Sequence, residues 1–376
     1  MLARLSWHVV LQLAVKELRS LWRDRLLLVF VVWAFSGAIY TAATATPDRL
    51  VRAPIGVVDE DQTVLSQRIV SAFYPPDFLT PDLISLGEMD AGLDTGRYSF
   101  VLDIPPGFQR DVLAGRRPAL QLNVDATQMR QAFVGTGHVQ SMIGLEIQEF
   151  AQGERAAAAS PVEQAVRMRF NPTSNSGWFT GVMEVINMVT MLSIILAGAA
   201  LIREREHGTL EHLLVMPVRP VEIMLAKVLA MGAVVLLASL LSLRLMVQGV
   251  LGMPIGDSLA LFMAGVALHL FATTSMGIFM GTVARSMPQL ALLIILVLLP
   301  LQMLSGGATP RESMPEIVRN VMLLAPTTHF VTLAQAVLYR GAGLAIVWPT
   351  LLAITAIGTA FFFAALSRFR KSLASA

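Results

Sequence analysis

Long apolar runs dominate the hydropathy pattern of this chain. Because a spanning helix needs about 20 mostly apolar residues, these runs predict an α-helical polytopic membrane protein with six transmembrane helices. The runs occupy residues 26–45, 178–202, 228–250, 258–283, 287–304 and 344–366.

The first run has an alternative interpretation as a secretory signal peptide. Ala43, Thr44 and Ala45 resemble a small-residue cleavage site. The 25 residues before the run, however, are too long for the n-region of a signal peptide. We therefore expect residues 26–46 to be retained as transmembrane helix 1.

The basic residues near the predicted spans indicate how the chain crosses the membrane. By the positive-inside rule, loops rich in lysine and arginine stay in the cytoplasm. This places both termini, including the basic tail 367–376, on the cytoplasmic side, and an even number of spans agrees. The residues are Arg4, Lys16, Arg19, Arg23, Arg25, Arg203, Arg205, Arg219, Lys227, Arg285, Arg368, Arg370 and Lys371.

Residues 1–25 carry an amphipathic helical pattern. Polar Gln12, Lys16, Arg19 and Arg23 occupy one face. The pattern predicts a helix lying on the inner leaflet, and a cytoplasmic helix packed on the rest of the protein would share it. The apolar face comprises Trp7, Val10, Leu11, Ala14, Leu18, Leu21 and Trp22.

Residues 47–175 form a more polar insert between the first two spans. Short apolar strands alternate there with helical patterns, which predicts a small periplasmic α/β domain that acts as a binding module. Its tight acidic cluster, Asp59, Glu60 and Asp61, favours a strand-to-helix turn capped by Asp61 over a calcium site. The expected strands are 55–58, 83–86, 98–103 and 120–124, and the expected helices are 63–73, 108–114 and 128–150.

Composition and missing motifs exclude several classes of function. Only 14% of residues are charged and the net charge is +2, so neither a soluble protein nor a nucleic-acid-binding protein is expected. The sequence has no cysteine, no HExxH pair and no phosphate-binding GxxxxGKS/T loop. We therefore predict no catalytic, cofactor-binding or metal site in this chain.

The cytoplasmic connection 203–220 contains one short predicted helix. Gly208 breaks the preceding helix, Thr209 is the expected cap, and Leu210, Leu213 and Leu214 form a stripe before Pro217. A two-turn helix is marginal in water. The stripe therefore needs a surface, either the underside of the bundle or a partner protein.

Two segments resemble the signatures of a known family. Residues 203–220 read REREHGTLEHLLVMPVRP, and residues 281–331 begin with GTVARSMPQLALLIILVLLPLQMLSGGATPRESMPEIV. Both are similar to ABC-2 type transport permeases, the membrane subunits of type V ABC exporters. The multidrug-efflux-like bacterial subgroup with a large periplasmic domain is the most similar.

The resemblance implies a membrane permease subunit of the bacterial inner membrane that exports drug- or lipid-like hydrophobic compounds. A separate ABC ATPase, which binds ATP and Mg, would dock on segment 203–220 as a coupling helix. A second permease subunit, identical or different, and optionally a periplasmic adaptor with an outer-membrane channel would complete the complex. The matched coupling residues are Glu204, Glu206, Gly208, Thr209, Glu211, Leu213, Leu214 and Pro217.

Segment 306–341 follows the fifth span and is neither clearly soluble nor clearly spanning. Residues 313–316 read as a capping box that opens one short helix, and Pro326 opens a second that stops at Gly341. In the resembled family such helices close the pathway on the outside. The gate candidates, each of which equally reads as a helix terminator, are Pro300, Gly306, Gly307, Pro310 and Pro326.

Ionisable groups inside the membrane are costly and are therefore functional candidates. Glu184, with Asn187 one turn away, and Arg244 lie at similar depth in their spans, so we expect an ion pair between them. Lining of the substrate path and a proton relay are the alternatives. His269 reads as a packing residue before a relay residue.

Two other functions share much of this pattern. A proton-coupled secondary transporter would use Glu184, Arg244 and His269, but would usually show repeated halves, which this sequence lacks. An ATP-driven mechanotransmitting complex would move only the periplasmic domain. The sequence identifies neither the substrate nor the ATPase, and the 20 methionines suit varied hydrophobic compounds without specifying one.

Overall fold

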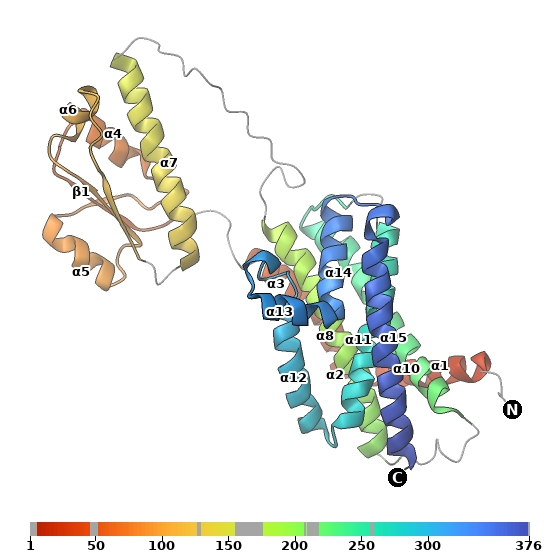
Figure 1. Cartoon of the computed structure of the whole chain (residues 1–376). Helices are drawn as coiled ribbons and strands as arrows, with labels where there is room; N and C mark the ends of the chain where they lie inside the picture. The colour runs from red at the N-terminus through yellow and green to blue at the C-terminus, as the bar shows by residue number, and fades with distance from the viewer. Residues whose placement is uncertain are drawn as a thin grey trace. The chain divides into compact units, whose positions relative to one another are not determined.

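The computed structural model describes residues 6–45, 52–125, 129–154, 176–206, 208, 218–255 and 259–374. The chain forms two compact units, and Figure 1 shows the helices and strands of each. A helical unit contains Met1–Thr46 and Met168–Ala376, and an inserted domain contains Pro47–Arg167.

Six helices in the described part of the chain are long and apolar enough to cross a membrane. Their positions confirm the six predicted spans. Two spans have irregular segments: the first bends between α2 and α3, and α10 continues as the π-helical segment η3. The helices are α2 (Arg25–Ala34) with α3 (Gly37–Thr44), α8 (Ser176–Glu206), α10 (Pro220–Ser242) with η3 (Leu243–Val250), α11 (Leu259–Val283), α12 (Met287–Leu304) and α15 (Leu344–Ala374).

Helix α8 is the central helix of the helical unit. Its most apolar stretch is 78% buried, against 22% for α12. Glycines bring it very close to α11: a Cβ on Gly277 would lie 2.5 Å from the backbone oxygen of Ile194, and one on Gly281 would lie 3.1 Å from that of Gly198. Small residues permit such close backbone approach between membrane helices.

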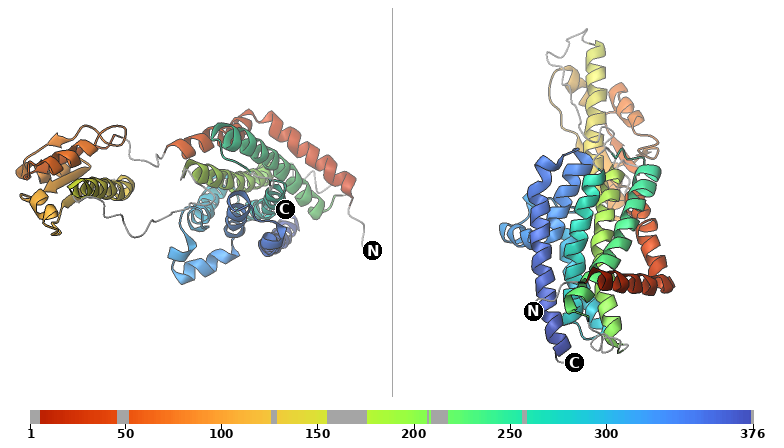
Figure 2. Two further views of the ribbon diagram at one scale, coloured as in Figure 1. Left: turned by 90° about the horizontal axis from the view of Figure 1, so that it is seen from above. Right: turned by 90° about the vertical axis from the view of Figure 1, so that its right-hand side faces the viewer.

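Helix α1 (Trp7–Arg23) precedes the first span and lies across the spanning helices, as Figure 2 shows. Val10 and Ala14 pack on Ala226 and Ala230 of α10. The predicted apolar face is thereby divided in two, because a second strip stays exposed next to the packed edge. This exposed strip comprises Trp7, Leu11, Val15, Leu18 and Trp22. Helix α1 is thus a packed helix with an exposed apolar strip, and its location on the inner leaflet stays a prediction.

Three short helical segments follow α12, and the last two meet at a bend of 92°. This confirms the predicted pair of short helices. The capping box at Ser313 is wrong, however, because the first helix begins after Pro315 and the Ser313 hydroxyl instead donates to the Pro310 carbonyl at 2.7 Å. The segments are η4 (Arg311–Ser313), α13 (Glu316–Val321) with η5 (Met322–Leu324), and α14 (Pro326–Ala334) with η6 (Gln335–Tyr339).

The inserted domain is built on a mixed sheet with strand order β2-β1-β3-β4. Strand β1 pairs in parallel with β2 and β3, and β3 pairs antiparallel with β4. The second expected strand is shorter than predicted, and α5 was not predicted. The elements are β1 (Ile55–Asp59), α4 (Val64–Ala72), β2 (Asp82–Leu83), η1 (Leu86–Glu88), α5 (Met89–Asp94), β3 (Phe100–Ile104), α6 (Phe108–Leu113), β4 (Gln121–Val124) and α7 (Met129–Glu154).

Aromatic residues fill the core of the inserted domain. Phe73, Phe78, Phe100 and Phe108 are almost fully buried. They share one cluster with Val139 and other apolar residues of α7. Helix α7 therefore packs on its own domain along this face.

Candidate functional site

The last four residues of α8, Arg203 to Glu206, fasten the helix to different elements. An Arg203 guanidinium nitrogen donates to Asp24, between α1 and α2, at 2.9 Å. Arg205 donates to the Ala284 carbonyl, after α11, at 2.7 Å, and the Glu206 carboxylate accepts from the Met287 backbone N–H of α12 at 3.1 Å. Because successive helix residues point about 100° apart, one short stretch reaches neighbours on several sides.

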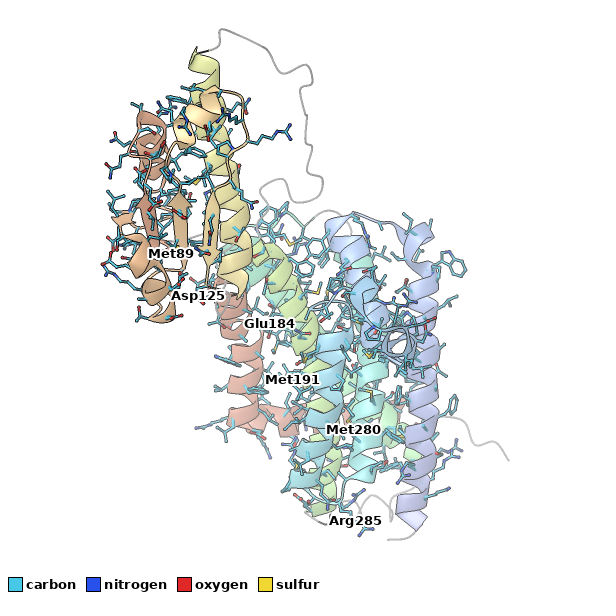
Figure 3. The ribbon with its side chains drawn as sticks, turned by 60° about the vertical axis from the view of Figure 1, so that its left-hand side comes forward. Met89, Asp125, Glu184, Met191, Met280 and Arg285 are labelled. Atoms are coloured by element: carbon cyan, nitrogen blue, oxygen red, sulfur yellow. The ribbon has the colours of Figure 1, made fainter. Side chains whose placement is uncertain are left out.

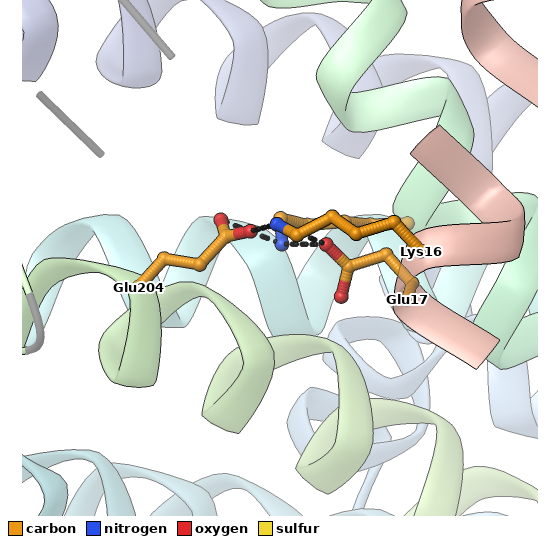
Figure 4. A network of polar contacts seen from close by, with 4 residues as sticks. Lys16, Glu17 and Glu204 are labelled. Atoms are coloured by element: carbon orange, nitrogen blue, oxygen red, sulfur yellow. Dashed lines mark hydrogen bonds and ion pairs between the residues drawn. The ribbon is translucent and has the colours of Figure 1, made fainter. Parts of the chain in front are cut away.

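Glu204, the remaining residue of this stretch, belongs to a buried charge cluster. The Lys16 ammonium donates to Glu204 at 2.6 Å, as Figure 4 shows. The Lys227 ammonium donates to Glu17 at 2.9 Å and lies 2.7 Å from Glu204. The cluster therefore joins α1, α8 and α10 with two positive and two negative charges.

Burial makes pairing obligatory for three of these four charges. The side chain of Lys227 is 1% exposed, and those of Glu17 and Glu204 are each 9% exposed. Lys16 is half-exposed; burial acts to lower its pKa, but the hydrogen bond and charge of Glu204, with those of Glu17, raise it above its usual value. A buried charge without its partner is strongly destabilising, so the three helices are held in one arrangement.

Helix α1 is fastened a second time at its N-terminal end. The Ser6 backbone N–H donates to Glu222 at 2.9 Å, and the Arg219 N–H donates to the same carboxylate at 2.9 Å. Glu222 is 3% exposed. The start of α1 and the start of α10 therefore share one buried acceptor.

The predicted coupling motif is only partly within the described residues. Glu204 and Glu206 make the contacts above, and Gly208 has a φ of +65°, a conformation that favours glycine. The others, Thr209, Glu211, Leu213, Leu214 and Pro217, lie outside the described residues.

The gate candidates lie in α12, in the turn that follows it and at the 92° bend. Pro300 lies inside α12, Pro310 precedes η4, and buried Pro326 opens α14. Gly306 has a φ of +97°, and a Cβ on Gly307 would meet the Met183 sulfur of α8 at 3.0 Å. The glycines thus allow a tight turn against α8 at Met183.

Glu184 and Arg244 do not form the expected ion pair. The Asn187 amide donates to Glu184 at 3.3 Å, and Arg244 donates to Gln248 at 3.0 Å within η3. Figure 3 shows Glu184 nearer the end of the unit opposite Arg285. Depth along a span was inferable from the sequence, but the rotation of each helix about its axis was not, and each side chain finds a partner on its own helix.

His269 lies in a buried polar cluster between α8 and α11. The Thr190 hydroxyl donates to the Ile186 carbonyl, so its 2.9 Å contact with His269 Nε2 requires a proton on that nitrogen. Ser193 donates to Thr273 at 2.6 Å beside this pair. The imidazole stacks on Phe330 of α14 with a centroid distance of 4.2 Å. This geometry is that of a packing residue.

The acidic cluster of the inserted domain also has a structural role. Asp61 accepts from the Thr63 hydroxyl at 2.6 Å and from the Gln109 N–H at 3.0 Å, so it caps α6, whereas Thr63 caps α4. Burial acts to raise the pKa of Asp61, but these hydrogen bonds and those from the Gly107 and Phe108 N–H groups lower it below its usual value. Asp61 is a cap, as predicted, but of another helix.

Sequence reasoning missed the residues that complete these clusters. The sequence pattern assigns Lys16 and Lys227 only to the cytoplasmic side of the membrane. It does not identify the other residues of these clusters as functional residues: Glu17, Glu222, Thr190 and Thr273. A signal was present, since Glu222 and Lys227 stand within the first turns of an otherwise apolar helix. Charges in such positions are rarely unpaired.

Comparisons with known proteins agree with this architecture. The family model for ABC-2 family transporter proteins matches residues 25–367. The chain is 61% identical over 364 residues, 97% of both chains, to the "Inner membrane transport permease YhhJ" of Escherichia coli (strain K12). It is 26% identical over 373 residues, 98% of this chain and 100% of the relative, to the "Probable multidrug ABC transporter permease YbhR" of the same organism. The match spans the transmembrane helices and the inserted domain alike, and the chain belongs to the ABC-2 family of transporter proteins.

Proposed function

We propose that this chain is the permease subunit of an ATP-driven exporter in the bacterial inner membrane. A separate ATPase, which holds ATP and Mg, docks on segment 203–220 as a coupling helix from the cytoplasm. Both termini of the permease lie on the same side as this segment, and the inserted domain lies in the periplasm. The names of the relatives, one an inner membrane permease and one a multidrug ABC transporter permease, support this assignment.

The fastening of residues Arg203 to Glu206 carries the proposal. A loop that receives force from a partner can move a membrane helix only if the two are rigidly joined. Here the last turn of α8, at the start of this segment, is bound to α1, α10, α12 and the end of α11. Movement of the docked loop would therefore shift these helices as one body.

The opposite end of α8 supplies the proposed outer gate. The turn at Gly306 and Gly307 lies against α8 at Met183, and the bent segments α13 and α14 follow this turn. A rigid shift of α8 would change the packing at this turn. Two permease subunits, identical or sister chains, would enclose the pathway, and the exported compounds would be hydrophobic, as drugs and lipids are. A periplasmic adaptor leading to an outer-membrane channel would receive the compound at the inserted domain.

Co-purification from native membranes tests the proposal. The tagged wild type is compared with Leu214→Arg, Glu206→Arg and the control Glu60→Arg, an exposed position in the inserted domain. We expect mass spectrometry to find a phosphate-loop ATPase with the wild type and the control. The amount of ATPase should fall at least tenfold with Leu214→Arg and with Glu206→Arg. An intact protein without an ATPase under any nucleotide condition would contradict the proposal and favour proton-driven transport through Glu184 and His269.

A further inference from the structure

An apolar groove opens between α1, α10 and α11. It has a volume of about 290 Å³ and is lined by Trp7 of α1, by α10 from Leu225 to Leu236, and by Ala267, Leu270 and Phe271 of α11. Gly232, Ala233 and Ala267 leave the hollow because their side chains are too small to fill the space between the two helices.

The groove is accessible from outside the bundle. Trp7 is 59% exposed and Leu229 42% exposed, and Ala233 and Ala267 are exposed as well. The stretch from Leu225 to Leu236 rises about 16 Å along the helix axis. This length matches one leaflet, which is about half of a 30 Å hydrocarbon core.

One end of the groove lies at the polar boundary of the membrane. Trp7 follows Ser6, whose N–H shares the Glu222 carboxylate with the N–H of Arg219 at the start of α10. Tryptophan side chains concentrate at membrane–water interfaces. The exposed face of the amphipathic helix α1 indicates the same level.

Basic residues lie at the same level as this end of the groove. Phe271 in the groove wall stacks on Phe362 of α15, and Phe369 of α15 packs in one cluster with Ile223 of α10. The C-terminal turns of α15 therefore lie at the level where α10 begins. These turns carry Arg368, Arg370 and Lys371, all exposed, and α10 begins after Arg219.

We infer that the groove binds one acyl chain of an anionic phospholipid. The chain lies along α10 toward the middle of the membrane, and the phosphate lies beside Trp7 and the basic residues. An almost wholly apolar lining suits an acyl chain, and lysine and arginine at the leaflet surface attract anionic head groups. Trp7 of α1 and Leu225 of α10 both line the groove, so one bound acyl chain contacts both helices. This inference does not depend on the proposed function.

Native mass spectrometry of the delipidated full chain tests the inference. Phosphatidylglycerol and phosphatidylcholine with identical acyl chains are added to wild type, Ala267→Phe and Ala264→Phe. Ala264 is exposed on the same helix but does not line the groove, so it is a matched control. We expect wild type and Ala264→Phe to retain one phosphatidylglycerol, and Ala267→Phe to retain it at least fivefold less.

Three results would overturn the inference. These are equal retention by all three proteins, equal retention of both lipids, or a loss of dimer in Ala267→Phe alone, which would assign the groove to a contact between two copies. A wild-type measurement covers the case in which the variant fails to fold. A phosphatidylglycerol with a photoreactive acyl chain should label peptides 225–236 and 259–271, and labelling spread evenly over all spans would also overturn the inference.

Discussion

The ammonium group of Lys227 in α10 lies 2.7 Å from the carboxylate of Glu204 at the end of α8. Both side chains are buried, and residues 205–226 separate them in the sequence. Glu17 and Lys16 of α1 complete the cluster. These four charges hold the end of α8 against α1 and α10, and stability is the first property that they should control.

Lys227→Met should destabilise the helical unit strongly. The substitution leaves the Glu17 and Glu204 carboxylates buried without the ammonium group that both contact, and breaking a buried pair costs about 3 to 5 kcal/mol. Lys16→Met is the matched control, because Lys16 is half-exposed and solvent screens its interactions, so its loss should cost about 1 kcal/mol. Thermal unfolding in detergent measures both, and equal effects of the two variants would contradict the assignment of Lys227 as the central charge.

Gly277→Ala should loosen the contact between α8 and α11. An added Cβ would lie 2.5 Å from the Ile194 backbone oxygen, so the two helices must separate. Overpacking of this kind costs about 1 to 3 kcal/mol. The control is Gly343→Ala, where a Cβ would meet nothing within 4 Å. A thermal unfolding midpoint for Gly277→Ala equal to that of Gly343→Ala would show that the contact tolerates expansion.

Thr190→Val should destabilise the bundle core by about 1 kcal/mol. Valine has nearly the same shape as threonine but leaves the His269 Nε2–H without its acceptor. Thr190→Ser keeps the hydroxyl and serves as the control for loss of the methyl group. If thermal unfolding shows serine to be as harmful as valine, packing at Thr190 decides stability and the hydrogen bond to His269 does not.

The inserted domain should lose stability in acid through Asp61. The hydrogen bonds to this carboxylate hold its pKa below the usual value of about 4. A lowered pKa means that the ionised form stabilises the folded domain. This contribution is complete above about pH 4 and is lost as the pH falls through the lowered pKa.

Asp61→Ala should therefore cost about 1 kcal/mol at pH 7 and should flatten the acid dependence below pH 4. Hydrogen exchange of peptides 52–125 in the full chain, followed from pH 7 to pH 3, measures both effects. Glu60→Ala, at an exposed neighbouring position, should leave the profile unchanged. An unchanged profile in Asp61→Ala would assign the acid sensitivity to other groups.

Much of the fold could be predicted from local sequence patterns. A stretch such as 287–304 is apolar enough to span a membrane whatever its neighbours are, and the short apolar run at 55–58 indicates a strand in the same way. The two short helices around Pro326 were also predictable, because proline and glycine act on the backbone at their own positions.

The sequence by itself determined the six spans, the α/β insert and the segment 203–220 as the place to look for coupling. Only the tertiary structure decided which charges meet: it paired Lys227 with Glu204 and kept Glu184 from Arg244. The physical reason is that hydropathy sums over one segment, whereas a side-chain pair depends on how two helices rotate and slide against each other. That choice is made by the packing of the whole bundle, including contacts as close as Gly277 against Ile194.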